Sequence, residues 1–117
     1  MELRDLVRSL LDGQALAARQ WVADAERARF SWASLALPKD LDGVGLAVAA
    51  GIVELLAGRA GQEPPSWTKD IGAAAEPILL VRAAAVLPNL RRMCEQDGPE
   101  PLRRRRILAP PEFLTFV

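Results

Sequence analysis

The chain has 117 residues, of which 50% are hydrophobic, mainly Ala, Leu and Val. One domain of this length can bury a core without disulfides or metal ions, and the abundance of alanine, the best helix former and a poor strand former, favours packed helices over a sheet. Fifteen basic residues balance fifteen acidic ones, which excludes a net charge that would draw the whole protein onto nucleic acid or an anionic membrane.

Two amphipathic helices are predicted at the start of the chain. In residues 3–11, leucine and valine recur at spacings of three and four residues, and Asp12-Gly13 ends the pattern. The second helix runs from Gln14 to between Phe30 and Trp32. Its inward stripe is predicted to hold Leu16, Ala17, Trp21, Ala25 and Ala28.

The most apolar helix is predicted for residues 42–59, with Asp40 or Asp42 as its N-cap. Between Leu46 and Ala57 only Glu54 is charged, so other helices should surround this one, and Ile52 and Leu56 should be fully buried. For Glu54 we expect a place at the solvent edge or a pairing with an arginine; the alternative is a buried functional carboxylate.

An irregular crossing that contains several prolines is predicted for residues 62–77, with Trp67 packed over the core. Residues 78–81, Ile-Leu-Leu-Val, are the best strand candidate. A lone strand has no partner to pair with, so we expect an extended or helical connector there. A further helix begins at Pro88 and ends at Asp97-Gly98, with inward side chains predicted at Leu87, Leu90, Met93 and Cys94.

The C-terminal tail combines a charged run with an apolar end. Arg103, Arg104, Arg105 and Arg106 are consecutive, and they are followed by Pro110-Pro111 and then by Phe113, Leu114, Phe116 and Val117. Apolar side chains left in water cost roughly 25 cal/mol per Å². The tail therefore either closes the core of its own domain or binds another molecule. For the arginines, the alternatives are a solvated turn, a contact with phosphate, or a contact with the acidic surface of a partner.

Candidate chemistry is sparse. The chain has no histidine, which removes the commonest general base and metal ligand, and it has one cysteine, Cys94, which we expect to be a buried structural thiol. There is no Gly-rich phosphate loop and no Cys/His metal spacing. We therefore predict a protein that is not an enzyme, with no catalytic residues, no metal site and no cofactor. The lone cysteine suits a reducing cytoplasm, and the longest apolar run, residues 44–53, is too short to span a membrane.

Together these patterns predict an all-α fold: one domain over residues 1–117, a compact bundle of four or five helices with a proline-rich crossing loop and an extended C-terminal tail. The order and spacing of the motifs in residues 63–68, 76–84 and 99–114 resemble a group of small uncharacterised bacterial proteins that are encoded beside nucleotidyltransferase-like proteins. The resemblance covers about the last two thirds of the chain. It implies an antitoxin-like protein that binds a nucleotidyltransferase-type toxin.

We expect a non-catalytic protein-interaction module in the cytoplasm, with Arg103, Arg104, Arg105, Arg106, Phe113 and Leu114 as its partner-binding residues. The alternative is a small nucleic-acid-binding protein that uses the cluster from Arg103 to Arg106. An enzyme with a carboxylate-based site is the third hypothesis, and a homodimer stays open.

Overall fold

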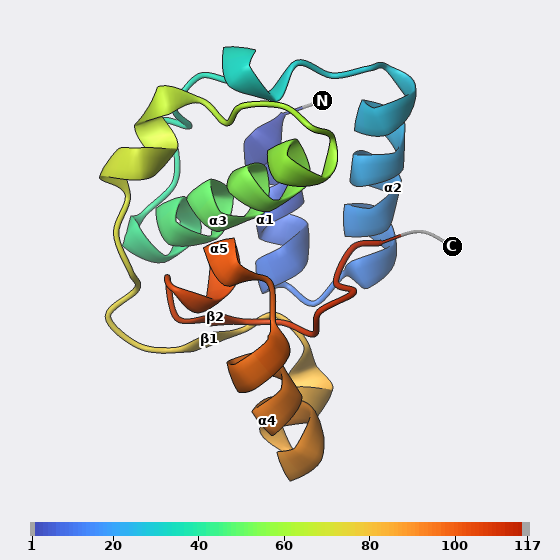
Figure 1. The fold of residues 1–117 in the computed structure, drawn as a ribbon, viewed down its shortest axis with the longest axis vertical. Coiled ribbons are helices and arrows are strands. Elements are labelled where there is room, and N and C mark those ends of the chain that lie inside the picture. The colour runs from blue at the N-terminus through green and yellow to red at the C-terminus, as the bar shows by residue number, and fades with distance from the viewer. Residues whose placement is uncertain (1, 116–117) are drawn as a thin grey trace.

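The computed structural model describes residues 2–115, which fold around one central helix (Figure 1). These residues form five α-helices, three short 3₁₀ helices and two short strands. In chain order the elements are α1 (Leu3–Leu11), α2 (Ala15–Arg27), η1 (Trp32–Ser34), α3 (Gly43–Arg59), η2 (Ser66–Asp70), β1 (Ile78–Leu79), η3 (Arg82–Ala85), α4 (Pro88–Asp97), α5 (Glu100–Arg103) and β2 (Ile107–Leu108). The predicted all-α class is thus correct for most of this structure, and the paired strands are the exception.

The two predicted helices at the start of the chain are α1 and α2, which form a hairpin, and Gly13 makes the turn with a φ of 72° that favours glycine. Helix α2 ends at Arg27, before the predicted end at residues 30–32. Arg29 takes the left-handed conformation, and the chain turns back so that Phe30 packs against Trp21 and Trp32 at ring-centroid distances of 6.2 and 5.2 Å.

The inward stripe of α2 differs from the predicted one. Its buried residues are Ala18, Trp21, Val22 and Ala25. Leu16 is 82% exposed, and Ala17 and Ala28 are exposed as well. The prediction for these three residues is therefore wrong. Alanine occurs all around this helix, so two neighbouring stripes have similar apolarity: Trp21 and Ala25 belong to both, and the buried stripe adds Ala18 and Val22.

Helix α3 is the core of the fold. Asp42 caps it, because its Oδ1 accepts a hydrogen bond of 2.8 Å from the backbone N–H of Gly45. Ile52 and Leu56 are buried, which confirms the prediction for both. Gly51 lets α5 approach closely: a Cβ at this position would lie 2.8 Å from Cδ2 of Leu102. No helix in residues 2–115 is both long enough and apolar enough to cross a membrane.

The crossing over residues 62–77 carries η2, and Trp67 packs against the core as predicted. Its indole N–H donates a hydrogen bond of 2.9 Å to the carbonyl of Leu35. Gln62 fixes the start of the crossing, because its side chain accepts from the N–H of Trp32 and donates to the carbonyl of Phe30. The irregular segment is therefore held by side-chain hydrogen bonds to distant backbone groups.

Residues 78–79 form a strand, which corrects the expectation of a connector. Strand β1 pairs in parallel with β2, with Ile78 opposite Ile107 and Leu79 opposite Leu108. A parallel pair needs a long crossover, and here η3, α4 and α5 supply it. The partner strand is two apolar residues directly after four arginines, a pattern too short to be recognised as a strand.

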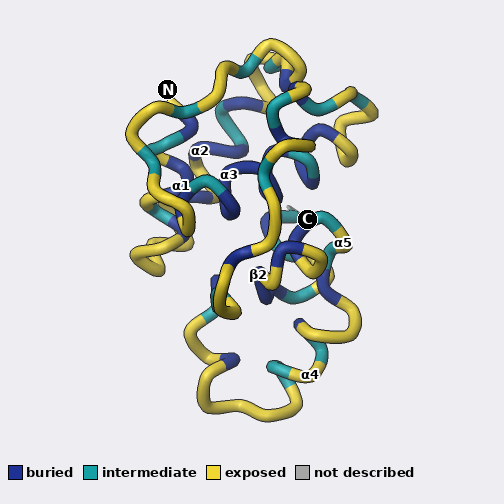
Figure 2. The backbone as a smooth tube through the Cα atoms, turned by 90° about the vertical axis from the view of Figure 1, so that its left-hand side faces the viewer, coloured by how far each residue is buried: buried dark blue, intermediate teal, exposed yellow. Residues whose placement is uncertain are grey.

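Helix α4 projects from the rest of the domain, at the bottom of Figure 1, and Figure 2 shows that it and the segment before it are largely exposed. Cys94 is buried against Ala84 and Leu108, as expected for a structural thiol. Leu87 is 52% exposed, so its predicted inward position is wrong. Leu87 is the N-cap residue of α4 and has extended backbone angles. Its side chain therefore does not follow the helical periodicity that places the later residues of α4.

We predict that Gly98→Ala destabilises the fold. A Cβ at Gly98 would lie 2.5 Å from the carbonyl oxygen of Cys94 and 2.6 Å from that of Ala109, and both are backbone atoms that cannot rotate away. The expected loss is about 1 to 3 kcal/mol in urea unfolding. The matched control is Gly58→Ala in α3, where a Cβ meets nothing within 4 Å and should gain up to about 1 kcal/mol. Equal stability of the two variants would contradict this packing.

Candidate interaction site

The four arginines of the tail do not act as one cluster. They span the end of α5 and the turn that leads into β2, so their side chains leave the chain in different directions. Arg105 is 3% exposed, whereas Arg103, Arg104 and Arg106 lie on the surface. The run is therefore divided between the core and the solvent.

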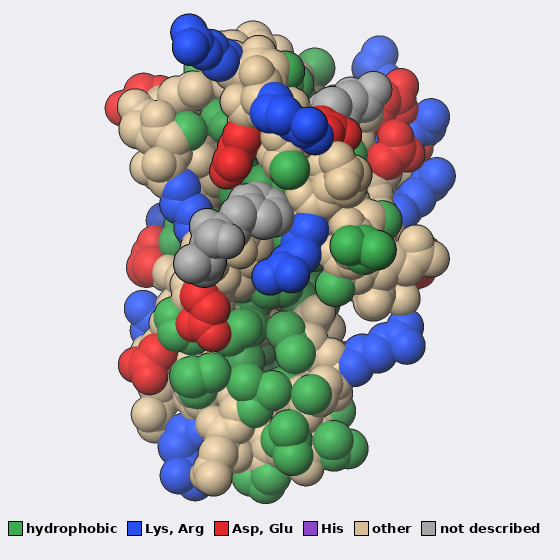
Figure 3. All heavy atoms as spheres, turned by 90° about the vertical axis from the view of Figure 1, so that its right-hand side faces the viewer, with side chains coloured by type: hydrophobic (Ala, Val, Ile, Leu, Met, Phe, Trp, Pro, Cys, Tyr) green, Lys and Arg blue, Asp and Glu red, His purple; other side chains and the backbone are tan. Residues whose placement is uncertain are grey.

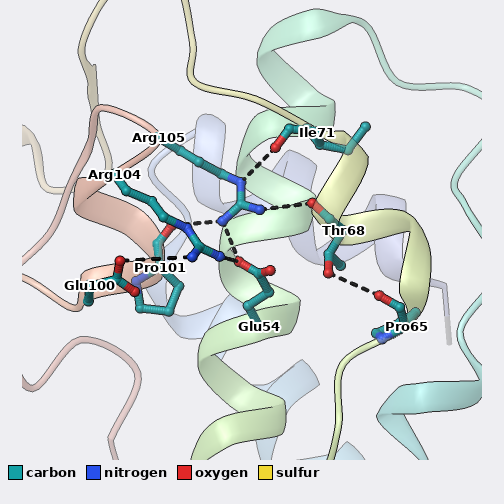
Figure 4. Close-up of polar contacts among 8 residues, drawn as sticks. All are labelled: Glu54, Pro65, Thr68, Ile71, Glu100, Pro101, Arg104 and Arg105. Carbon is teal, nitrogen blue, oxygen red and sulfur yellow. Dashed lines mark hydrogen bonds and ion pairs between the residues drawn. The ribbon is translucent and has the colours of Figure 1, made fainter.

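Arg105 joins three separate segments (Figure 4). Its guanidinium pairs with the carboxylate of Glu54 in α3. It also donates to three carbonyl oxygens, those of Thr68 at 2.9 Å, Pro101 at 3.1 Å and Ile71 at 3.2 Å. The prediction that Arg105 contacts a partner is therefore wrong: its donors are used inside the domain, in the fork geometry that only a guanidinium provides.

Glu54 is the acceptor for two of the four arginines. Its side chain is 9% exposed, and Arg104 pairs with it from the solvent side. Burial opposes the ionisation of Glu54, but the hydrogen bonds from Arg105 and Arg104, together with their positive charges, outweigh burial and lower the pKa of the carboxyl below its ordinary value. This confirms the expected pairing of Glu54 with an arginine.

Arg103 and Arg106 lie away from Glu54. Arg103 donates from Nη1 to the carbonyl of Gln96 at 3.0 Å, and Arg106 donates from Nη1 to the carbonyl of Ala75 at 3.1 Å. With Arg91 of α4 they line a hollow of about 330 Å³, which we call the arginine pocket; its other lining residues are Pro77, Glu95 and Leu108.

The apolar end of the tail packs on its own domain. Leu114 is 7% exposed and belongs to the core, and Phe113 is half-buried against the same core. Arg59, at the end of α3, donates to the carbonyls of Phe113 and Pro111 and holds this segment in place. Leu114 is therefore a core residue, and its role as a partner contact stays a prediction. Phe116 and Val117 lie outside the described residues.

A larger hollow, of about 410 Å³, lies between the α1–α2 hairpin and the tail, and we call it the tail groove. Its lining residues are Ser9, Leu10, Gly13, Ala15, Arg19, Leu80, Val81, Arg82, Pro110, Glu112, Phe113 and Leu114. Of the residues predicted to bind a partner, only Phe113 and Leu114 reach it. Sequence patterns did not single out the rest, because the groove joins three segments that are distant in the chain.

Two large exposed apolar residues lie close in the chain to residues that line this groove. Leu16 follows the lining residue Ala15, and Val86, at 77% exposure, follows η3, whose first residue Arg82 lines the groove. Figure 3 shows apolar side chains gathered over the lower half of one face, where Figure 1 places η3 and the start of α4. The sequence signal for this surface is Val86-Leu87, two large apolar residues directly before a helix-starting proline.

Two observations concern metal ligands and the thiol within residues 2–115. These residues contain no group of three or more His, Cys, Asp or Glu side chains that is arranged to hold a metal ion. Burial raises the pKa of the Cys94 thiol, and the charges of Glu112 and Glu95 raise it further. The reactive thiolate is therefore disfavoured at this position.

Comparison with known proteins gives no match: no family model, no curated protein and no solved structure corresponds to this chain. What the chain binds is therefore inferred from its own surface and side chains.

We predict that Arg104→Gln and Arg105→Gln, which remove the same charge beside the same carboxylate, differ widely in stability. Arg105→Gln leaves Glu54 without its buried partner and three carbonyls without their donor, so it should cost about 3 to 5 kcal/mol. Arg104 is half exposed, and its loss should cost less than about 1 kcal/mol. Urea unfolding measures both. Similar losses of unfolding free energy in the two variants would contradict the prediction that the buried arginine contributes more to stability than the exposed one.

The lowered pKa of Glu54 also predicts a pH dependence of folding. A carboxyl whose pKa is lower in the folded state stabilises the fold above its unfolded pKa of about 4.3, and this contribution disappears as the pH falls through the folded value. Glu54→Gln should therefore flatten the loss of stability below about pH 4.5. Urea unfolding of both proteins between about pH 3 and pH 7 tests this. Parallel curves over the whole range would contradict the prediction.

Proposed function

We propose that this chain is a non-catalytic protein-interaction module that binds a protein partner at the tail groove. The observations that carry the proposal are the apolar residues Leu10, Leu80 and Phe113 in the lining of the groove and the exposure of Leu16 and Val86, at 82% and 77%. Leu16 follows the lining residue Ala15 in the chain, and Val86 comes four residues after the lining residue Arg82. Large apolar side chains that remain in water next to a hollow are typical of a protein-binding surface, because covering them gains roughly 25 cal/mol per Å².

The charges of the groove indicate the chemistry of the occupant. Arg19 and Arg82 line the groove, and Glu112 is its one acidic residue. Within residues 2–115, neither arginine has a carboxylate within 4 Å. We therefore propose that the occupant is a partner segment with apolar side chains in the groove and carboxylates at its rim, where they would meet Arg19 and Arg82.

For the identity of the partner we propose a nucleotidyltransferase-like protein encoded nearby, with this chain as its antitoxin-like inhibitor in the cytoplasm. The support is the resemblance of residues 63–68, 76–84 and 99–114 to small uncharacterised bacterial proteins that are encoded beside nucleotidyltransferase-like proteins, which implies an antitoxin-like role. The nucleic-acid-binding alternative is weaker, because Arg104 and Arg105 are paired with Glu54 and the four arginines do not present one continuous basic stripe.

The proposal predicts that Leu16→Asp and Val86→Asp each weaken partner binding by about tenfold or more, since each places a charge in an apolar contact that also meets carboxylates. The matched control is Leu37→Asp, at a residue that is 47% exposed and does not line the groove. All three residues are on the surface, so thermal melting should change little.

Binding is measured by titration calorimetry with the purified nucleotidyltransferase-like protein. Unchanged affinity in both groove variants, or an equal loss in Leu37→Asp, would contradict binding at the tail groove. Absence of any complex with the wild-type chain would contradict the identity of the partner.

A further inference from the structure

We infer that the arginine pocket binds a dianionic phosphate group, carried either as free phosphate or as a small phosphate monoester. The pocket brings together Arg91 from α4, Arg103 from α5 and Arg106 from the turn before β2. It shares no lining residue with the tail groove, so this site is separate from the proposed partner surface.

Two of the guanidiniums are already positioned. Arg103 is tied to the carbonyl of Gln96 and Arg106 to that of Ala75, each through one N–H group. A guanidinium has about five N–H donors, so most donors of each remain for a ligand. Side chains that are ordered before binding lose less entropy when a ligand arrives.

The backbone at Arg106 supports a role for its side chain. Its φ of 63° is the left-handed conformation, which costs a non-glycine residue energy and which glycine adopts freely. An arginine at this position directs its guanidinium to the segment before β1, next to the pocket. Strained residues of this kind gather at functional sites.

The charge of the pocket matches a dianion. Three arginines and the single carboxylate of Glu95 line it, which leaves two positive charges in excess. Glu95 lies 3.7 Å from Arg91, whereas within residues 2–115 neither Arg103 nor Arg106 has a carboxylate within 4 Å. A phosphate monoester carries about −1.5 to −2 at neutral pH, and its oxygens match the forked donors of a guanidinium.

The walls favour a small ligand over a nucleic-acid strand. Pro77 and Leu108 are the apolar lining residues, and no aromatic side chain lines the pocket. Proteins that follow a single strand rely on aromatic side chains on which bases stack. The hollow of about 330 Å³ has room for a phosphate with a short organic group attached.

The test is a titration of the purified chain with inorganic phosphate at constant ionic strength, followed by calorimetry or by NMR shifts. Arg103→Gln and Arg106→Gly should each weaken binding by about tenfold or more, because each removes a charge-assisted contact. The glycine suits the left-handed backbone at position 106, so this variant keeps the fold. The matched control is Arg92→Gln, which removes an exposed arginine of α4 that does not line the pocket and should leave binding unchanged.

The pH dependence identifies the charge of the ligand. A phosphate monoester loses its second proton near pH 6, and inorganic phosphate loses it at a somewhat higher pH. The binding of both should therefore weaken several-fold from about pH 7.5 to pH 5, whereas sulfate, a dianion throughout, should bind equally at both. Glycerol 3-phosphate distinguishes the two sources: tighter binding than free phosphate assigns the site to a monoester, and equal or weaker binding assigns it to free phosphate.

Three results would overturn the inference. The first is the absence of saturable phosphate binding, and the second is an equal loss in Arg92→Gln. The third is tighter binding of a single-stranded oligonucleotide without terminal phosphate, with a steep dependence on salt. Leu16→Asp should leave phosphate binding unchanged, so a failure of this inference and a failure of the proposed function are distinguishable.

Discussion

The buried pair between Arg105 and Glu54 is the interaction on which the C-terminal half of the structure depends. The guanidinium of Arg105 joins α3 to the crossing segment and to α5. It also donates hydrogen bonds to three backbone carbonyl oxygens. A buried ion pair contributes little net stability by itself, because both charges lose water. The same guanidinium meets acceptors on all three segments, so it ties them together. Strand β2, which pairs with β1, starts two residues later.

Much of the helical framework could be predicted from local sequence. The ends of α1 and α3, the Asp42 cap and the burial of Ile52 and Leu56 follow from periodicity and capping. The parallel strand pair could not be predicted, because it joins two dipeptides that are distant in the chain. The register of α2 was also ambiguous. In an alanine-rich helix the buried stripe depends on long-range packing, and α2 buries Ala18 and Val22 together with Trp21, which packs against Phe30 and Trp32.

The candidate site was less predictable than the fold. Four identical arginines give no sequence signal for which of them is buried, because that depends on where Glu54 of α3 meets the turn. The sequence leaves open whether the apolar tail closes the core or meets a partner, and in the structure Leu114 and Phe113 both pack on the core and both line the groove. The apolarity of Leu16 predicts a core position, and its 82% exposure is a feature that only the structure provides.

Both surfaces proposed here share one structural basis. The arginine pocket takes Arg103 and Arg106 from either side of Arg105, and the tail groove takes Phe113 from the segment that Arg59 holds against α3. Arg105 and Arg59 thus each hold backbone carbonyl groups through hydrogen bonds, Arg105 near the start and Arg59 near the end of residues 103–114, the segment that contributes to both sites. A wall that is already ordered loses less conformational entropy on binding than a free tail would. The arginines of this tail that are used inside the domain therefore make possible the binding roles of those that remain at its surface.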